Sequence, residues 1–182
     1  MKKLFITVSL IGALIGITSC NKIKDALFPA IDVELPAFQF SIPAIPFVLN
    51  SEASLGSFTM KFNLDSIIRA NTAGAFGAGA VSTVKVKQMV ISIPNGDQLN
   101  NLANFESARF TFSSNTKTTP AEILSINFPD TYSTSTTFTP TDSPELKEYL
   151  SGSELTYTLY GKARRITTKS LTFNIQVTLS AK

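Results

Sequence analysis

A strict alternation of apolar and polar residues near the carboxyl end is the feature that most constrains how this chain folds. Five apolar residues occupy every second position: Leu171, Phe173, Ile175, Val177 and Leu179. A period of two places their side chains on one face of a β-strand, and five such side chains in succession predict a strand near the centre of a sheet. Burying each side chain stabilises the fold by about 1.5–3 kcal/mol. We therefore expect a charge at Phe173 or Ile175, or removal of the last ten residues, to unfold the protein.

The same alternation recurs along the chain, with turn residues between the segments. It covers residues 57–64, 81–93, 108–112, 124–128 and 155–159. The parity of the apolar positions changes at Lys87-Gln88, which predicts a β-bulge or a crossing between sheets. Residues 28–49 also alternate but contain four prolines. Because proline cannot donate to a β-ladder, this segment predicts edge strands.

Helical signals are few. Ser143, Pro144, Glu145 and Gly152 are spaced as the cap, first turn and terminator of one short helix. Residues 65–69 predict a single turn capped by Asp65. About eight strands with one short helix predict an all-β fold, an antiparallel β-sandwich of immunoglobulin-like or jelly-roll type. A closed barrel is the alternative that periodicity leaves open.

The first twenty residues predict where the protein resides. Lys2 and Lys3 precede an apolar run over residues 4–17, and Ile17-Thr18-Ser19 leads into Cys20, the only cysteine. The segment resembles the signal peptide of a bacterial lipoprotein, in which a lipobox is cut before a cysteine whose thiol receives a diacylglycerol. The resemblance implies lipidation at Cys20 and attachment to a membrane through that residue. The alternatives are a transmembrane anchor, for which the run is shorter than the about 20 residues required, and a plain secretory signal with an incidental cysteine.

This resemblance divides the chain into three parts. Residues 1–19 are expected to be a signal peptide, residues 20–29 a tether and residues 30–182 the β-sandwich domain. The domain itself resembles uncharacterised lipoproteins of Bacteroidetes, and this likeness supplies no catalytic residue. It implies a lipid-anchored protein of the outer membrane, on the periplasmic face or the cell surface. Asp65-Ser66-Ile67 also resembles an O-glycosylation sequon of some Bacteroidetes, although a helix cap explains the same residues.

Composition excludes several kinds of chemistry. The chain has no histidine, so Ser-His-Asp and Cys-His catalytic units and His-ligated metal sites are excluded. Lipidation of Cys20 leaves no thiol for catalysis or metal ligation. Loss of Lys2 and Lys3 with the signal leaves 14 basic and 13 acidic side chains, a net charge of +1, which gives no electrostatic footprint for nucleic acid. We therefore predict no enzyme activity, no cofactor, no metal site and no catalytic residue.

Two loops could be mistaken for ligand sites. Residues 70–80 are rich in glycine and alanine, but they lack the Lys-Ser/Thr of a phosphate-binding loop. Asp97 lies near Asn95, Asn100 and Asn101, but the order of residues that calcium loops require is missing. We interpret both segments as connections.

Three classes of function remain. The favoured class is a non-catalytic envelope lipoprotein whose sandwich binds an envelope protein or a glycan, with residues 70–80 and 132–141 as contact loops. A carrier of lipid or another hydrophobic ligand would use the Phe-rich interior. A glycoside hydrolase would need two carboxylates about 5–10 Å apart, whereas the acidic residues here are scattered singly.

Overall fold

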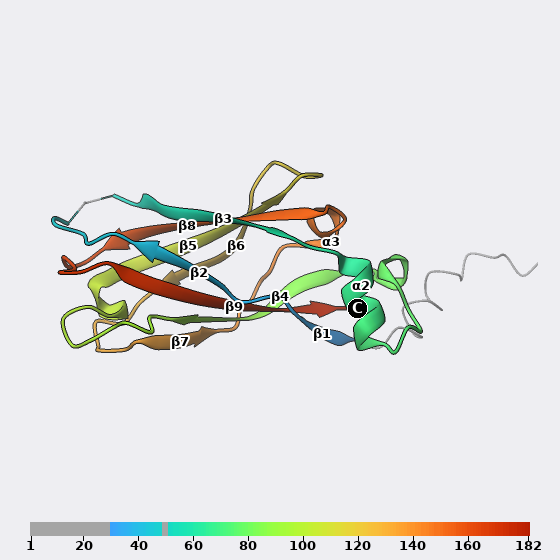
Figure 1. Cartoon of the computed structure of the whole chain (residues 1–182), viewed down its shortest axis with the longest axis horizontal. Coiled ribbons are helices and arrows are strands. Elements are labelled where there is room, and N and C mark those ends of the chain that lie inside the picture. Colours follow the sequence, from blue (N-terminus) through green and yellow to red (C-terminus); the bar gives the residue numbers. More distant parts are fainter. Residues whose placement is uncertain (1–29, 49–50) are drawn as a thin grey trace, which may run out of the picture.

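Two antiparallel β-sheets face each other in the computed structural model, which describes residues 30–48 and 51–182 (Figure 1). The elements are β1 (Ile31–Glu34), β2 (Phe38–Ile42), β3 (Ala53–Lys61), α2 (Leu64–Asn71), η1 (Ala78–Ala80), β4 (Val84–Ser92), η2 (Leu102–Asn104), β5 (Phe105–Ser114), β6 (Ala121–Asn127), β7 (Ser135–Phe138), α3 (Lys147–Leu150), β8 (Glu154–Ala163) and β9 (Leu171–Ala181). The predicted all-β antiparallel sandwich is confirmed. Within the described ranges, no helix combines the length and the apolar character that crossing a membrane requires.

Strand β9 is the centre of the first sheet, whose order is β1–β9–β4–β7, with β2 also paired to β9. The second sheet has the order β3–β8–β5–β6. The five alternating apolar residues of β9 are each at most 3% exposed, because they point toward the second sheet. The central position predicted for this strand is therefore confirmed.

The proline-containing segment forms one interrupted edge of the first sheet. Strand β1 pairs with Thr178–Ala181 and β2 pairs with Leu171–Ile175, both antiparallel to β9. Between them, the Leu35 amide donates to the Val177 carbonyl at 3.0 Å, and Pro36 follows where a ladder donor would otherwise stand. The predicted edge strands are confirmed.

The change of parity in the long fourth strand is a bulge. The pairing of β4 with β9 shifts register between Val86 and Gln88. Because one extra residue lies in β4, Val86 and Met89 are both buried although their positions differ in parity.

The predicted helix limits need correction. Helix α3 begins only at Lys147, and its N-cap residue Leu146 makes no side-chain capping bond. The Ser143 hydroxyl accepts instead from the Val86 amide at 2.8 Å, and the Glu145 carboxylate accepts from the Val84 amide at 2.7 Å. Both side chains satisfy the free edge of β4. The Glu145 carboxylate also accepts from the Lys147 amide at 2.9 Å, so of the two only Glu145 bonds to the first turn of α3.

The turn expected at residues 65–69 is part of the eight-residue helix α2. Its cap is Asn63, whose side-chain oxygen accepts from the Ser66 amide at 2.9 Å. Asp65 lies in the first turn, where it pairs with Arg69 at 2.6 Å and accepts from the Ala78 amide at 2.9 Å. The residue expected to cap the turn therefore holds the following loop against the helix.

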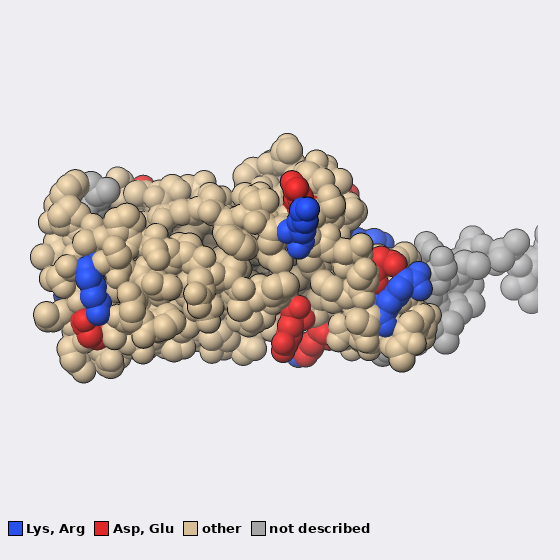
Figure 2. All heavy atoms as spheres, in the orientation of Figure 1, with Lys and Arg blue, Asp and Glu red and all other residues tan. Residues whose placement is uncertain are grey.

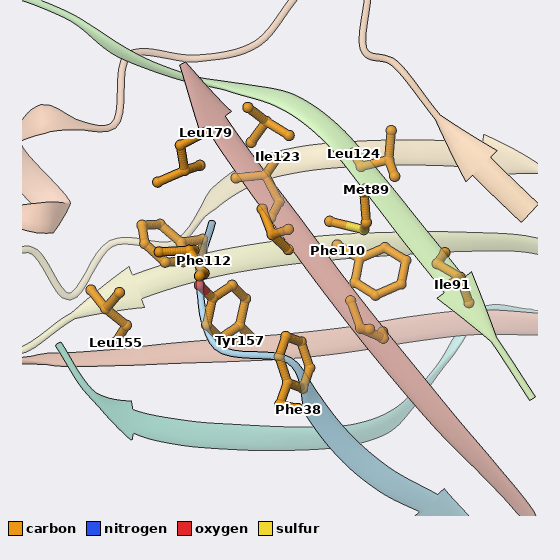
Figure 3. Packing of buried hydrophobic residues seen from close by; sticks show 14 of the residues in the cluster. Phe38, Met89, Ile91, Phe110, Phe112, Ile123, Leu124, Leu155, Tyr157 and Leu179 are labelled. Atoms are coloured by element: carbon orange, nitrogen blue, oxygen red, sulfur yellow. The ribbon is translucent and has the colours of Figure 1, made fainter. Parts of the chain in front are cut away.

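The space between the sheets is filled mainly by aromatic and branched side chains, as Figure 3 shows. The Phe38 ring lies 5.1 Å from Phe58 and 4.8 Å from Tyr157, and Tyr157 lies 5.1 Å from Phe112. Among the described residues, none supplies a hydrogen-bond partner for the buried Tyr157 hydroxyl. Desolvation raises the pKa of this phenol. The buried hydroxyl, unpaired among these residues, therefore lowers the stability of the folded protein.

The sandwich has two dissimilar ends. At one, which we call the α2 end, β1 begins beside the end of β9, and α2, η1 and α3 gather (Figure 1). At the other, which we call the loop end, four connections meet: residues 43–48, 93–104, 128–134 and 164–170. The long axis of β9 separates the two ends.

Candidate binding surface at the loop end

Cys20 lies outside the described residues, so its lipidation stays a prediction. Ser66 of the possible glycosylation sequon is exposed on α2, and its modification is likewise a prediction.

The Asp97 loop is built around hydrogen bonds within the protein. One Asp97 carboxylate oxygen accepts from the Leu99 and Asn100 amides, each at 2.9 Å, while the other pairs with Lys169 at 2.6 Å. Lys169, then Asn100, lowers the pKa of Asp97 to about 2. The residues that the structure describes contain no group of three His, Cys, Asp or Glu side chains able to hold a metal. The interpretation of this loop as a connection therefore fits its bonding.

Buried asparagine side chains join this loop to the β8–β9 connection. Asn104 donates through Nδ2 to the carbonyls of Leu99 and Ile166, at 2.9 and 2.7 Å. Asn100 accepts from the Thr168 amide at 2.7 Å. Both asparagines are at most 4% exposed, so the two loops are fixed to each other by bonds shielded from water.

The other two loops are held in the same way. The Thr167 amide donates to the Ile45 carbonyl at 3.1 Å, and the Ile45 amide donates to the Thr167 hydroxyl at 2.8 Å. The Leu102 amide donates to the Ser133 carbonyl at 2.8 Å, and Arg165 forms an ion pair with Asp130. Four segments distant in sequence thus form one connected surface.

This surface exposes large apolar side chains. The exposed large apolar residues of the described chain are Phe47, Val48, Leu99, Tyr132 and Ile166, which are 43–72% exposed. All five belong to the loop end, and we call them the loop-end patch. Large exposed apolar residues that gather at one end of a domain are a candidate interaction site, whereas single exposed apolar residues scattered over a surface are common.

Of the two contact loops predicted from the sequence, one contributes a residue to the patch. Tyr132 is the first residue of the predicted contact loop 132–141, but that loop continues as β7 along the edge of the first sheet. The other predicted loop, residues 70–80, lies at the α2 end. Neither predicted contact loop contains a run of apolar residues that would have pointed to the patch. The residues of the patch come from four separate turns.

The interior leaves little room for a carried ligand at its aromatic edge. The pocket bounded by Phe38, Phe40, Phe58 and Tyr157 has a volume of about 10 Å³. Ligand sites for small molecules have volumes of about 300–1,000 Å³. This pocket gives the carrier hypothesis no support.

Two carboxylates do line one groove. Glu122 of β6 and Asp142 lie on the two sides of a groove of about 360 Å³ between β6 and residues 138–142. Both residues are exposed. The groove therefore holds both carboxylates in contact with solvent.

Figure 2 shows few charged side chains on the visible face, and cations there lie directly beside carboxylates. This agrees with the ion pairs of the loop end, where Lys169 pairs with Asp97 and both Arg164 and Arg165 pair with Asp130. The loop end is therefore apolar at its exposed tips and nearly neutral around them.

Comparisons with known proteins leave the chain without an assigned family. No family model matches it, and no curated protein matches it.

Solved structures resemble it distantly. A structure of infectious bursal disease virus Gt strain is 10% identical with a TM-score of 0.38; the chain aligns over 84% of its own length and spans 32% of that chain. The family 32 CBM from C. perfringens NanJ in complex with galactose is 9% identical with a TM-score of 0.35, over 80% of this chain and 99% of that one. The decameric BFDV capsid protein is 8% identical with a TM-score of 0.33, over 85% and 99%. At TM-scores below 0.5, these likenesses carry no inference about function. The class of protein that the fold and surface define is a two-sheet antiparallel β-sandwich with an apolar loop end.

Proposed function

We propose that the protein is a non-catalytic lipoprotein of the bacterial envelope, anchored through Cys20, that binds another envelope component with its loop end. The observation that carries the proposal is the position of the five patch residues, all at one end of the sandwich. That component is an envelope protein or a glycan. The outer membrane is the expected site of anchoring.

The path of the chain supports an orientation in which the α2 end lies next to the membrane and the loop end lies far from it. The described domain begins with β1, whose Ile31 pairs with Ala181 at the α2 end. A tether of residues 20–29 would hold that end next to the membrane. Strand β9 has 11 residues and spans about 35 Å, so the loop end would face away from the anchoring bilayer.

The surface chemistry supports binding rather than catalysis. Most carboxylates of the described chain are held singly in ion pairs with Lys or Arg, as Asp32 is with Lys87 and Glu52 with Arg109. A pair of carboxylates that divides acid and base roles needs environments that separate their pKa values. The exposed Glu122 and Asp142 lack such a difference in burial.

The test has two parts, both on the full-length protein isolated from bacterial membranes. The mass of the amino-terminal peptide should equal that of a peptide beginning at Cys20 with a diacylglycerol and, where N-acylation occurs, a further acyl chain. Cys20→Ser should release the protein from the membrane. An unmodified Cys20, or membrane attachment that survives this substitution, would refute the anchor.

The second part concerns the loop end. Envelope material retained by the wild-type protein should be lost from the double variant Leu99→Ser/Ile166→Ser and kept by Gln98→Ser, a change of an exposed residue beside the patch. Equal retention by all three proteins would refute the binding surface.

A further inference from the structure

We infer that the partner of the loop end is a folded protein that presents an apolar surface with a nearly neutral rim. This inference rests on the proposed function and names the class of partner for the same surface. Four features support it: the exposed side chains of the patch, the bonded amides of the loop end, the paired charges of the loop end, and the position of the amino-terminal segment.

The exposed side chains suit an apolar protein surface better than a glycan. Val48, Leu99 and Ile166 are aliphatic and 43–72% exposed. Branched aliphatic side chains fill irregular apolar depressions on a protein surface and form no hydrogen bonds with sugar hydroxyl groups. Phe47 and Tyr132 add two aromatic rings, and aromatic residues are enriched at protein interfaces.

The buried asparagines of the loop end already use their side-chain amides within the protein. Asn104 uses its Nδ2 on two carbonyls and its Oδ1 on the Asn101 amide. Asn101 uses Nδ2 on the Asp97 and Gln98 carbonyls and Oδ1 on the Ala103 amide. A glycan presents many hydroxyl groups, each of which needs a donor or acceptor from the protein. These amides have little capacity left for that purpose.

The charges of the loop end argue against a lipid surface. Its cations are Arg164, Arg165 and Lys169, and each is paired with Asp97 or Asp130. Arg164 also donates to the carbonyls of Ala103 and Phe128. Recognition of anionic membranes uses clusters of about four to eight free basic residues, which this end does not present. A partner with a nearly neutral rim meets these paired charges without leaving one of them unpaired.

The proposed anchor makes the chain's own amino-terminal segment a poor occupant of the patch. Residues 21–29 would span about 32 Å when fully extended, which is close to the length of about 35 Å along β9. With Cys20 held in the membrane beside the α2 end, this segment would be drawn away from the loop end. We therefore expect the occupant to come from another molecule.

Rigid support makes the patch suitable for tight binding. Leu99 and Ile166 are fixed through their carbonyls to one side chain, that of Asn104. Phe47 follows Ile45, which is bonded twice to Thr167. Loops ordered before binding lose less conformational entropy when the partner arrives.

The experiment uses the full-length lipidated protein in living cells. The photoreactive amino acid benzoylphenylalanine replaces Leu99, Ile166 or, as the control, Gln39, which is exposed on β2 at the edge of the first sheet. Irradiation should give the same discrete protein adduct from positions 99 and 166, with at least about tenfold lower yield from position 39. The adduct should be destroyed by protease. Mass spectrometry of the adduct identifies the second protein.

The purified second protein is then titrated against the purified lipoprotein. Leu99→Ser should weaken binding by roughly tenfold or more, because a buried Leu side chain contributes that much, while Gln98→Ser should change it less than about twofold. Affinity should vary little between 50 and 500 mM salt, since few unpaired charges take part. Strong weakening by salt, or equal affinity of the Leu99→Ser variant, would overturn the inference.

The remaining outcomes separate the inference from the proposed function. Adducts at positions 99 and 166 that contain lipid or glycan and no second protein would overturn the inference alone. So would co-flotation of the protein, in a manner dependent on Leu99, with added vesicles of phosphatidylethanolamine and phosphatidylglycerol. Adducts confined to position 39, or none at any position, would overturn the proposed function together with the inference.

Discussion

The two ends of the sandwich differ in which kinds of residue they bury and which they expose. At the α2 end, the apolar side chains of α2 turn inward, with Leu64 and Ile68 buried, and the outward face carries the ion pair of Asp65 and Arg69. At the loop end, buried amides such as Asn104 hold the backbone, and large apolar side chains such as Leu99 point into solvent. The exposed large apolar residues of the described chain are all at the second end.

The exposed apolar residues therefore do not result from a core too small to hold them. The loops that carry them are as well bonded as the α2 end, so polar residues at the tips of these loops would not reduce stability. Exposure of apolar side chains lowers solubility and contributes nothing to folding, which supports the proposal that the loop end associates with a partner.

The largest effect is expected from a charge in β9, which supports both ends. Ile175 is fully buried, and Ile175→Asp would place a carboxylate between the sheets, at a cost of more than about 4 kcal/mol. We expect loss of the cooperative urea transition and of the native far-ultraviolet circular dichroism spectrum. Asn174→Asp, on the outer face of the same strand, is the matched control and should unfold normally. Native-like stability of Ile175→Asp would contradict the position of β9 in the core.

The next largest loss of stability is expected from removing a buried asparagine side chain, and it compares the two ends directly. Asn104→Ala removes three hydrogen bonds of a residue that is 4% exposed. Leaving buried backbone groups unpaired should lower the free energy of unfolding by about 2–4 kcal/mol. Asn71→Ala at the α2 end removes one exposed bond, from Nδ2 to the Ile67 carbonyl, and should cost less than about 1 kcal/mol.

Urea denaturation monitored by circular dichroism measures both asparagine variants. Hydrogen exchange should also show faster exchange confined to residues 93–104 and 164–170 in Asn104→Ala. Equal destabilisation by the two substitutions would refute the claim that buried amides fix the loop end.

A smaller change in the free energy of unfolding, of opposite sign, is expected from a substitution in the core between the two ends. The Tyr157 hydroxyl is buried and without a hydrogen-bond partner among the described residues. Tyr157→Phe removes that polar group while keeping the ring contacts with Phe38 and Phe112, so it should raise the free energy of unfolding by about 1 kcal/mol. A thermal melt compares the variant with wild type. A loss of more than 1 kcal/mol would show that the hydroxyl is bonded.

The smallest effect concerns acid stability at the loop end. Lys169 and Asn100 hold the pKa of Asp97 at about 2, below its ordinary value of 3.8. A folded-state pKa below the unfolded value stabilises the protein above pH 3.8, and this contribution is lost as the pH falls through about 2. Asp97→Asn should therefore flatten the decline of the melting temperature between pH 4 and pH 2. An unchanged slope, together with an Asp97 titration by NMR near pH 4, would contradict the pairing with Lys169.

Sequence periodicity predicted the sheets because side-chain alternation is a local property. The alternation in β9 gave its central position, and the change of parity at Lys87 gave the bulge in β4. The helix near Ser143 was placed too early because the Ser143 and Glu145 side chains bond to β4, a tertiary contact that no local rule contains. Asn63 was overlooked as a cap because Asp65, two residues later, fits the same rule.

The binding surface was beyond reach of the sequence for a related reason. Leu99 and Ile166 are 67 positions apart, and each stands alone in a polar turn. Only the folded chain shows that Asn104 holds both. The resemblance of residues 17–20 to a lipobox, in contrast, rests on a local motif, and it predicts an anchor at Cys20 independently of the fold.

We propose that the apolar loop end faces away from the membrane to which Cys20 is expected to be attached. Because Cys20 is the only cysteine and its thiol would be acylated, one introduced cysteine gives a unique labelling site in the full-length protein. A donor fluorophore is attached through Gln98→Cys at the loop end or Ala75→Cys at the α2 end, and the natively lipidated protein is reconstituted into vesicles that contain an acceptor lipid. We predict strong energy transfer from position 75 and weak transfer from position 98. Transfer that is equal or stronger from position 98, or no association with the vesicles, would contradict it.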